Sequence, residues 1–303
     1  MEYWENLPNL DNSTFSSYLD DNCLNNYIFR GLSENVDENL FDSSFDRAIS
    51  ILNSQDRRII NSDRWLYEAY LLYQFKRRAH FYLRETGAPN PNDFLEWLSL
   101  MRHYGSPSRL VDFSYSFYIA LYFAIYRGRK NKDACIIAIN WKWLVDKVEK
   151  GLVHNSKRKK KKYFQDPKVF HKYAMIHRDK KGNIVEPRSF IIPVRPFRSN
   201  ERIHMQQGLF LCPANINLTF EENLTDSNFS KSSELKKNIK KIVIPIKEIP
   251  DLINALKKMN ISAESLYPGL SGFSESLNDL FYNDIKLIYI DRYLQSLSLD
   301  TIF

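Results

Sequence analysis

The chain has 303 residues, 44% of them hydrophobic, which is enough for a substantial core in one large domain or two small ones. Its three widely spaced cysteines form no CxxC pair and no HExxH motif occurs, which argues against a structural zinc site or a zincin. The N-terminus lacks the basic and apolar blocks of a signal peptide, and the longest apolar-rich run, residues 113–126, is too short to cross a bilayer of about 30 Å. The sequence therefore predicts a soluble, cytoplasmic protein without a metal.

The net charge of +7 comes from one central segment. Residues 1–126 hold 11 Lys and Arg against 17 Asp and Glu, residues 127–181 hold 18 against 5, and the remainder holds 14 against 14. Six consecutive cations lie in that segment, at Lys157, Arg158, Lys159, Lys160, Lys161 and Lys162. Because like charges at this density repel one another, we expect a surface loop, inserted at about residues 151–182. It is either a solvated insertion that keeps the protein soluble or a patch that attracts the phosphates of a nucleic acid.

Hydrophobic periodicity predicts mostly helices in the first half of the chain. A strong 3.6-residue stripe begins at Trp65, and a second amphipathic helix delivers His103 at its end. The expected elements are a polar arm at 1–24, a strand at 26–31, helical spacing at 36–53, helices at about 63–83 and 94–104, a strand at 109–116 and a helix at 117–126.

The second half is expected to consist mostly of strands, without a regular alternation of strands and helices. This order predicts an α+β fold, in which a helical N-terminal half packs on a mixed, mainly antiparallel sheet. Neither GxGxxG nor GxxxxGK[ST] occurs, so a dinucleotide-binding Rossmann domain and a P-loop ATPase are disfavoured. The expected elements are strands at 134–140, 189–194, 208–213 and 239–246, helices at 142–150, 248–259 and 274–283, a turn-rich segment at 262–272 and a C-terminal tail at 284–303.

The middle of the chain places several polar residues directly before its longest apolar run. Gly105 can take the left-handed conformation of a helix C-cap, and Pro107 prevents the helix from continuing. His103, Arg109 and Asp112 would then lie on a turn and a strand, where side chains can reach a cleft. In the structural alternative, Arg109 and Asp112 form a buried pair and His103 caps the preceding helix. We expect Asp112 to be ionised and held by Arg109 or Arg30, because an isolated carboxylate beside the apolar run would be costly.

Five sequence blocks together resemble the FRG domain family over about residues 25–280, so the expected domain spans 25–283. The departures from the family pattern are Arg102 for the usual Gln, Ser108 for Thr and Phe113 for Trp, and the basic loop is not part of that pattern. The blocks are Phe29-Arg30-Gly31, His103-Tyr104-Gly105-x-Pro107-x-Arg109-Leu110-x-Asp112, Ala120-Leu121-Tyr122-Phe123-Ala124, Arg202 with Gln206-x-Gly208-x-Phe210, and Ser265-Leu266-Tyr267-Pro268-x-Leu270-x-Gly272.

The order of these blocks is also similar to that of ADP-ribosyltransferase folds, and this resemblance implies NAD as the substrate. Cleaving the bond between nicotinamide and ribose passes through an oxocarbenium-like state, which a site stabilises with oriented dipoles or a carboxylate. Gln206 would occupy the position of the usual catalytic glutamate, and Asp112, Glu201 or Glu222 could supply the missing charge. The resemblance assigns catalytic positions to Arg30, His103, Asp112, Ser114 and Gln206, and cofactor-binding positions to Arg30, Tyr104, Arg109, Ser114 and Ser116.

Two classes of function follow from the sequence. The first is an NAD-dependent ADP-ribosyltransferase, acting as a bacterial toxin or anti-phage defence effector on a nucleic-acid or protein target and paired with an antitoxin. The second is a non-catalytic module in which the same pocket binds a nucleotide or another phosphate-bearing ligand. A Ser-His-Asp hydrolase is a weaker alternative, because no GxSxG motif surrounds Ser114 or Ser116. In either main case, we expect Arg30, His103, Arg109, Asp112, Ser114 and Gln206 to converge on one cleft.

Overall fold

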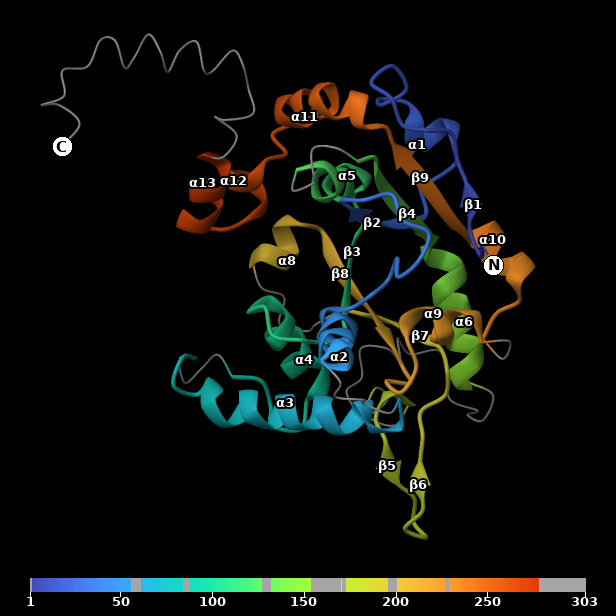
Figure 1. Ribbon diagram of the computed structural model, residues 1–303, viewed down its shortest axis with the longest axis vertical. Coiled ribbons are helices and arrows are strands. Elements are labelled where there is room, and N and C mark those ends of the chain that lie inside the picture. Colours follow the sequence, from blue (N-terminus) through green and yellow to red (C-terminus); the bar gives the residue numbers. More distant parts are fainter. Residues whose placement is uncertain are drawn as a thin grey trace, which may run out of the picture.

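The centre of the computed structural model is a seven-stranded sheet in the order β1-β9-β4-β2-β3-β8-β7 (Figure 1). The structure describes residues 2–55, 61–83, 88–126, 132–153, 170, 173–195, 201–226 and 229–277. The strands are β1 (Glu5–Asn6), β2 (Tyr27–Leu32), β3 (Val111–Ser114), β4 (Ala134–Asn140), β7 (Ile191–Val194), β8 (Gly208–Pro213) and β9 (Ile239–Ile244), with a separate ribbon of β5 (His177–Arg178) and β6 (Ile184–Val185). In the large sheet, β1 and β9 are parallel and the other pairs are antiparallel. The predicted α+β class with a mixed, mainly antiparallel sheet is confirmed.

Helices come from both halves of the described chain. They are α1 (Tyr18–Asp21), α2 (Ser44–Ser54), α3 (Arg64–Ala79), α4 (Phe94–His103), α5 (Phe117–Ile125), α6 (Trp141–Val153), α8 (Glu201–Met205), α9 (Phe220–Thr225), α10 (Ser232–Asn238), α11 (Ile249–Lys258), α12 (Ala263–Leu266) and α13 (Leu270–Ser276). Short 3-10 turns lie at Asn61–Asp63 and Ile246–Glu248. The expected division into a helical first half and a strand-rich second half is only partly correct, because the central strands β2 and β3 belong to the first half. None of the described helices is long and apolar enough to cross a membrane.

Residues 2–24, expected to belong to a polar arm, are part of the folded domain. Glu5 and Asn6 pair with Lys240 and Lys241 at the edge of the sheet. Trp4, Leu10 and Tyr18 are buried among core residues. The sequence did not predict this packing, because the segment is mostly polar. Its few core-facing residues do not recur with the period of a helix or a strand.

Two hydrophobic layers cover the two faces of the sheet, and β4 shows the alternation most clearly. Ile137 and Ile139 pack into the layer that contains α6 residues, whereas Ile136 and Ala138 pack with α5 and α11. Successive side chains of a strand point to opposite faces, so a strand that is buried on both faces is apolar throughout. Burial on both faces therefore explains the uninterrupted apolar sequence of β4.

The glycine of the Phe-Arg-Gly block allows α5 to pack directly on β2. A Cβ atom on Gly31 would lie 2.0 Å from the carbonyl oxygen of Ala120 and 2.6 Å from the amide nitrogen of Ala124. Both contacts are with backbone atoms, which a rotamer change cannot move. The Ala-x-x-x-Ala spacing places the two small residues one helical turn apart, on the same face of α5. Gly31 of the Phe-Arg-Gly block and the two alanines of the Ala-x-x-x-Ala block therefore form one close contact between β2 and α5.

Two buried ion pairs anchor the helical layer. Arg109 pairs with Glu68 of α3, and Arg64 at the start of α3 pairs with Asp46 of α2. Arg109 also donates hydrogen bonds to the carbonyl oxygens of Ala174, at 2.9 Å, and of Ala214, at 3.2 Å. Since its side chain is only 2% exposed, Arg109 acts as a buried connector between α3 and the sheet.

Candidate functional site

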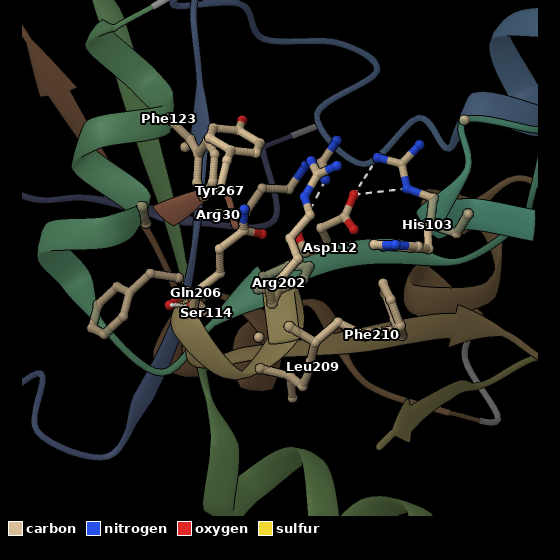
Figure 2. A pocket seen from close by; sticks show the side chains of 18 residues that line it. Arg30, His103, Asp112, Ser114, Phe123, Arg202, Gln206, Leu209, Phe210 and Tyr267 are labelled. Carbon is tan, nitrogen blue, oxygen red and sulfur yellow. Dashed lines mark hydrogen bonds and ion pairs between the residues drawn. The ribbon is translucent and has the colours of Figure 1, made fainter. Parts of the chain in front are cut away.

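A cleft of about 400 Å³ lies where β2, β3 and the start of β8 meet α4, α5, α8 and the residue after α12 (Figure 2). β2 and β3 pair at one position, Phe29 opposite Ser114, and the cleft begins beside that pair. Its lining consists of Phe29, Arg30, Gly31, Arg102, His103, Gly105, Asp112, Phe113, Ser114, Ala120, Phe123, Arg202, Ile203, Gln206, Gly208, Leu209, Phe210 and Tyr267.

The end of α4 delivers two side chains to this cleft. Gly105 adopts a φ of +80°, and the amides of Gly105 and Ser106 donate to the carbonyl oxygens of Arg102 and Met101 at 3.2 and 2.9 Å. These two bonds form a Schellman motif, which ends a helix and turns the chain away. The predicted glycine C-cap is therefore correct. Because the helix stops there, Arg102 and His103 occupy its last turn and face β3.

Asp112 of β3 is held by Arg102, not by Arg109 or Arg30 as expected. The Nε atom of Arg102 donates to Oδ2 of Asp112 at 2.9 Å, and a second guanidinium nitrogen contacts the same oxygen. Arg30 does reach Asp112, but its Nη1 atom donates to the main-chain oxygen at 3.2 Å. The sequence could not distinguish these partners, because the choice depends on how α4 is rotated against β3. Figure 2 shows the side chains of Arg30 and Asp112 next to one another in the cleft.

Arg30 and Arg202 bring two further positive charges into the cleft. Neither forms an ion pair with a carboxylate in the described part of the chain, and the Nε atom of Arg30 is buried without a hydrogen-bond partner. The guanidinium of Arg202 lies over the ring of Tyr267, 4.7 Å from its centroid. Tyr267 in turn meets Phe123 edge to face, with ring centroids 6.4 Å apart. The cleft thus has a cationic part next to an aromatic wall.

The electrostatics of the cleft favour an anionic ligand. Three lining guanidinium groups face one lining carboxylate, so the described lining carries a net charge of +2 when its histidine is neutral. Burial and the charge of Arg202 lower the pKa of His103, which is therefore neutral at pH 7. Burial also lowers the pKa of Arg30, to about 10, so this residue stays charged. Burial alone would raise the pKa of Asp112, but Arg102, Arg30 and Arg202 outweigh it and lower the pKa.

Ser114 and Gln206 both line the cleft, and a hydrogen bond joins them. The hydroxyl of Ser114 donates to the main-chain oxygen of Gln206 at 2.8 Å and accepts from the amide of Ser116 at 3.0 Å. The side-chain amide of Gln206 donates to the carbonyl oxygen of Leu266 at 3.2 Å. The Ser114 hydroxyl is thus occupied in holding the chain before β8, whereas the carboxamide oxygen of Gln206 remains available as an acceptor.

Three of the expected site residues are not brought to the cleft. Arg109 is buried against Glu68, because its strongest partner lies on α3. Tyr104 is 64% exposed just beyond α4, and Ser116 caps α5 by accepting from the amide of Ile119 at 3.3 Å. Convergence on one cleft is therefore observed for Arg30, His103, Asp112, Ser114 and Gln206, but not for Arg109, and the roles of Tyr104 and Ser116 lack this geometric support.

The alternative carboxylates are not at the cleft either. Glu222 lies in the capping box of α9, where its carboxylate accepts from the amide of Thr219 at 2.7 Å, and Glu201 is exposed on α8. Neither belongs to the lining, which leaves Asp112 as the carboxylate within the described cleft. The basic run Lys157–Lys162 and the tail at 284–303 lie outside the described residues.

The sequence interpretation missed several lining residues, including Arg102, Arg202, Phe123 and Tyr267. Arg202 and Tyr267 stand in two of the five blocks, so their place in these blocks was an available signal. Arg102 was noticed only as a departure from the family pattern. Phe123 also stands in one of the blocks, but it lies in an apolar helix, so its hydrophobicity indicated a core position and not a cleft.

The comparison with protein families agrees with the resemblance over the first part of the chain. Residues 25–133 match the FRG domain family. The matched segment includes Arg30, the end of α4, β3 and α5, and hence the part of the cleft that holds the Arg102–Asp112 pair. The blocks at Arg202, Gln206 and Tyr267 lie after the matched segment. No curated protein and no solved structure matches the chain. The similarity to ADP-ribosyltransferase folds therefore stays a prediction.

Proposed function

We propose that the cleft binds a phosphate-bearing nucleotide. The observation that carries this proposal is the pair of arginines, Arg30 and Arg202, that face the cleft without a carboxylate partner among the described residues. Guanidinium groups bind phosphate oxygens in a planar, bidentate geometry. Asp112 is paired with Arg102 and forms no ion pair with Arg30 or Arg202, although its charge acts on both. A ligand anion could pair with these two arginines directly.

The rest of the lining suits a nucleoside attached to that phosphate. Tyr267 and Phe123 offer aromatic surface for a base, and a flat ring could also stack against the guanidinium of Arg202. The carboxamide oxygen of Gln206 can accept a hydrogen bond from a ribose hydroxyl. A cleft of about 400 Å³ lies within the usual range for small-molecule sites, roughly 300–1,000 Å³.

A second candidate function is NAD-dependent ADP-ribosyl transfer in the same cleft. It is favoured by the ionised carboxylate of Asp112, which shares the cleft with Gln206 and could stabilise an oxocarbenium-like ribose. In this reaction the bond between nicotinamide and ribose breaks, its electron pair leaves with nicotinamide, and a nucleophile of the target forms the new bond. The enzyme would act in the cytoplasm as a toxin or anti-phage effector on a nucleic acid or protein, with an antitoxin as partner.

Calorimetric titration with ADP, adenosine and inorganic phosphate tests the binding proposal. Wild type should bind ADP more tightly than adenosine, and Arg30→Gln or Arg202→Gln should remove most of that difference. Arg188→Gln, which removes an exposed arginine that is not in the lining, is the matched control. Equal affinities of wild type for ADP and adenosine would refute the proposal. Release of free nicotinamide from NAD by wild type, lost in Asp112→Asn, would show that the cleft breaks the bond between nicotinamide and ribose, the step that both transfer and hydrolysis require.

A further inference from the structure

Helix α3 exposes an aromatic face to solvent. Tyr70 is 61% exposed, Tyr73 57% and Tyr67 39%, and Leu66 on the same side is 48% exposed. Residues three or four positions apart lie on the same side of a helix, so the four side chains form one continuous strip. In Figure 1, α3 runs along the outer edge of the molecule beside α4, its packing partner. An exposed apolar patch of this kind marks an interaction surface.

The opposite side of α3 fixes the rotation of the helix. Glu68, Leu72 and Ala79 are buried, and Glu68 is held by the ion pair with Arg109. Breaking that pair would leave an uncompensated buried charge, so the helix cannot turn its tyrosines inward without a large cost. Their exposure is therefore a fixed property of the fold.

The charges on α3 select the kind of partner. Glu68 is the one acidic residue within the helix, and it points inward. Arg77 and Arg78 are exposed in the last turn, directly after the aromatic strip. Asp63, the residue that precedes the helix, is half-buried at the far end. The strip therefore ends in two accessible cations and carries no exposed carboxylate, which favours a partner that has both flat rings and negative charge.

We propose that this α3 face, formed by Leu66, Tyr67, Tyr70, Tyr73, Arg77 and Arg78, binds single-stranded nucleic acid. Every base has a flat face that can stack on tyrosine, and phosphates can be neutralised by the two arginines. Binding by stacking and phosphate contact is tolerant of sequence, so the surface selects single strands without reading bases. The proposal goes beyond the nucleotide cleft and does not depend on it, since no residue of the α3 face belongs to the cleft lining.

Fluorescence anisotropy with a labelled single-stranded oligothymidine, measured over a range of salt concentrations on the full chain, tests this proposal. Combining Tyr70→Ala with Tyr73→Ala should weaken binding at least about fivefold for each tyrosine without changing the salt dependence. Combining Arg77→Ala with Arg78→Ala should reduce the slope of log affinity against log salt by about 1.4, or about 0.7 for each lost phosphate contact. The double change Tyr70→Phe and Tyr73→Phe keeps both rings and should keep the affinity.

Two matched controls lie on other helices. Lys236→Ala with Lys237→Ala removes two adjacent exposed cations from the last turn of α10, and Phe273→Ala removes an aromatic ring that is 48% exposed on α13. Neither control should weaken binding. The proposal is wrong if wild type does not bind the oligothymidine, or if the controls weaken binding as much as the α3 variants. It is also wrong if the tyrosine changes leave binding intact and instead abolish a dimer in sedimentation, which would make the face a contact between two copies. Loss of ADP binding in the cleft has no bearing on these outcomes.

Discussion

Arg102 and Asp112 form an ion pair in the lining of the cleft, with 2.9 Å between Nε and Oδ2. The pair joins the last turn of α4 to the middle of β3, two elements that the chain separates by a turn. It also places a protein carboxylate among three guanidinium groups, where a ligand phosphate would bind. Asp112 therefore both holds Arg102 in position and competes with an anionic ligand for it.

Replacing Asp112 with Asn should tighten the binding of ADP severalfold. The change raises the net charge of the described lining from +2 to +3 and frees Arg102 for the ligand. The fold should lose only about 1 kcal/mol, because the Asp112 side chain is 48% exposed to the cleft and pairs of this kind contribute little. Calorimetry and urea denaturation measure the two effects. Asp37→Asn, which removes the partner of Lys241 outside the cleft, is the control that should not alter ADP affinity. Weaker ADP binding by Asp112→Asn would show that the carboxylate mainly holds Arg102 in place.

Replacing Gly31 with Ala should destabilise the protein by about 3 kcal/mol, the upper end of overpacking effects. The new Cβ atom would lie 2.0 Å from the carbonyl oxygen of Ala120, and only a shift of α5 or β2 could relieve the clash. Gly208→Ala is the matched control, because the atom nearest to its new Cβ would be the backbone oxygen of Ile203, at 3.3 Å. That change should cost less than about 1 kcal/mol. Chemical denaturation of both variants checks the difference, and equal stabilities would contradict the close-packing argument.

The extent to which the sequence predicted the fold depended on how local each signal was. The strands at 134–140 and 208–213 were predicted with the bounds that the structure has, because both are uninterrupted apolar runs that are buried along their length. The strand expected at 239–246 ends at Ile244, where Pro245 interrupts the ladder. The strand expected at 109–116 is shorter, since Arg109 turns away into its pair with Glu68.

The candidate site was predictable as a group of residues but not as a set of contacts. Arg30, His103, Asp112, Ser114 and Gln206 were all expected in one cleft and line it. Asp112 was given the wrong partners, Arg109 or Arg30, because only tertiary packing decides which nearby arginine reaches its carboxylate. Glu68, the true partner of Arg109, lies 41 positions away, and nothing in the helical stripe of α3 marks it as buried.

Replacing Arg109 with Met should destabilise the fold by about 3–5 kcal/mol, because the carboxylate of Glu68 would be left buried and unpaired. Combining Arg109→Met with Glu68→Leu should recover much of that loss, since neither charge then remains. In conditions where the variant is folded, its affinity for ADP should equal that of wild type, because Arg109 does not line the cleft. Thermal denaturation and calorimetry separate the two effects. A loss of ADP binding in the folded double variant would show that Arg109 takes part in binding the ligand.

His103 should make the protein less stable as the pH falls below about 6.5, the usual pKa of an unfolded histidine. Burial and Arg202 lower its pKa in the folded state, so between the two pKa values the unfolded chain binds more protons. His103 therefore does not change the stability above the pKa of the unfolded state, and it lowers the stability as the pH falls from that value toward the pKa of the folded state. Urea denaturation at pH 7.5, 6.5 and 5.5 should show a larger loss for wild type than for His103→Gln, whose side chain cannot titrate. Other titratable groups contribute equally to both proteins, so the difference between their plots of stability against pH comes from His103.

The control is His204→Gln, which removes an exposed histidine of α8. This variant should lose as much stability between pH 7.5 and 5.5 as wild type does. If wild type and His103→Gln lose stability in parallel, burial and the charge of Arg202 do not keep the His103 imidazole neutral.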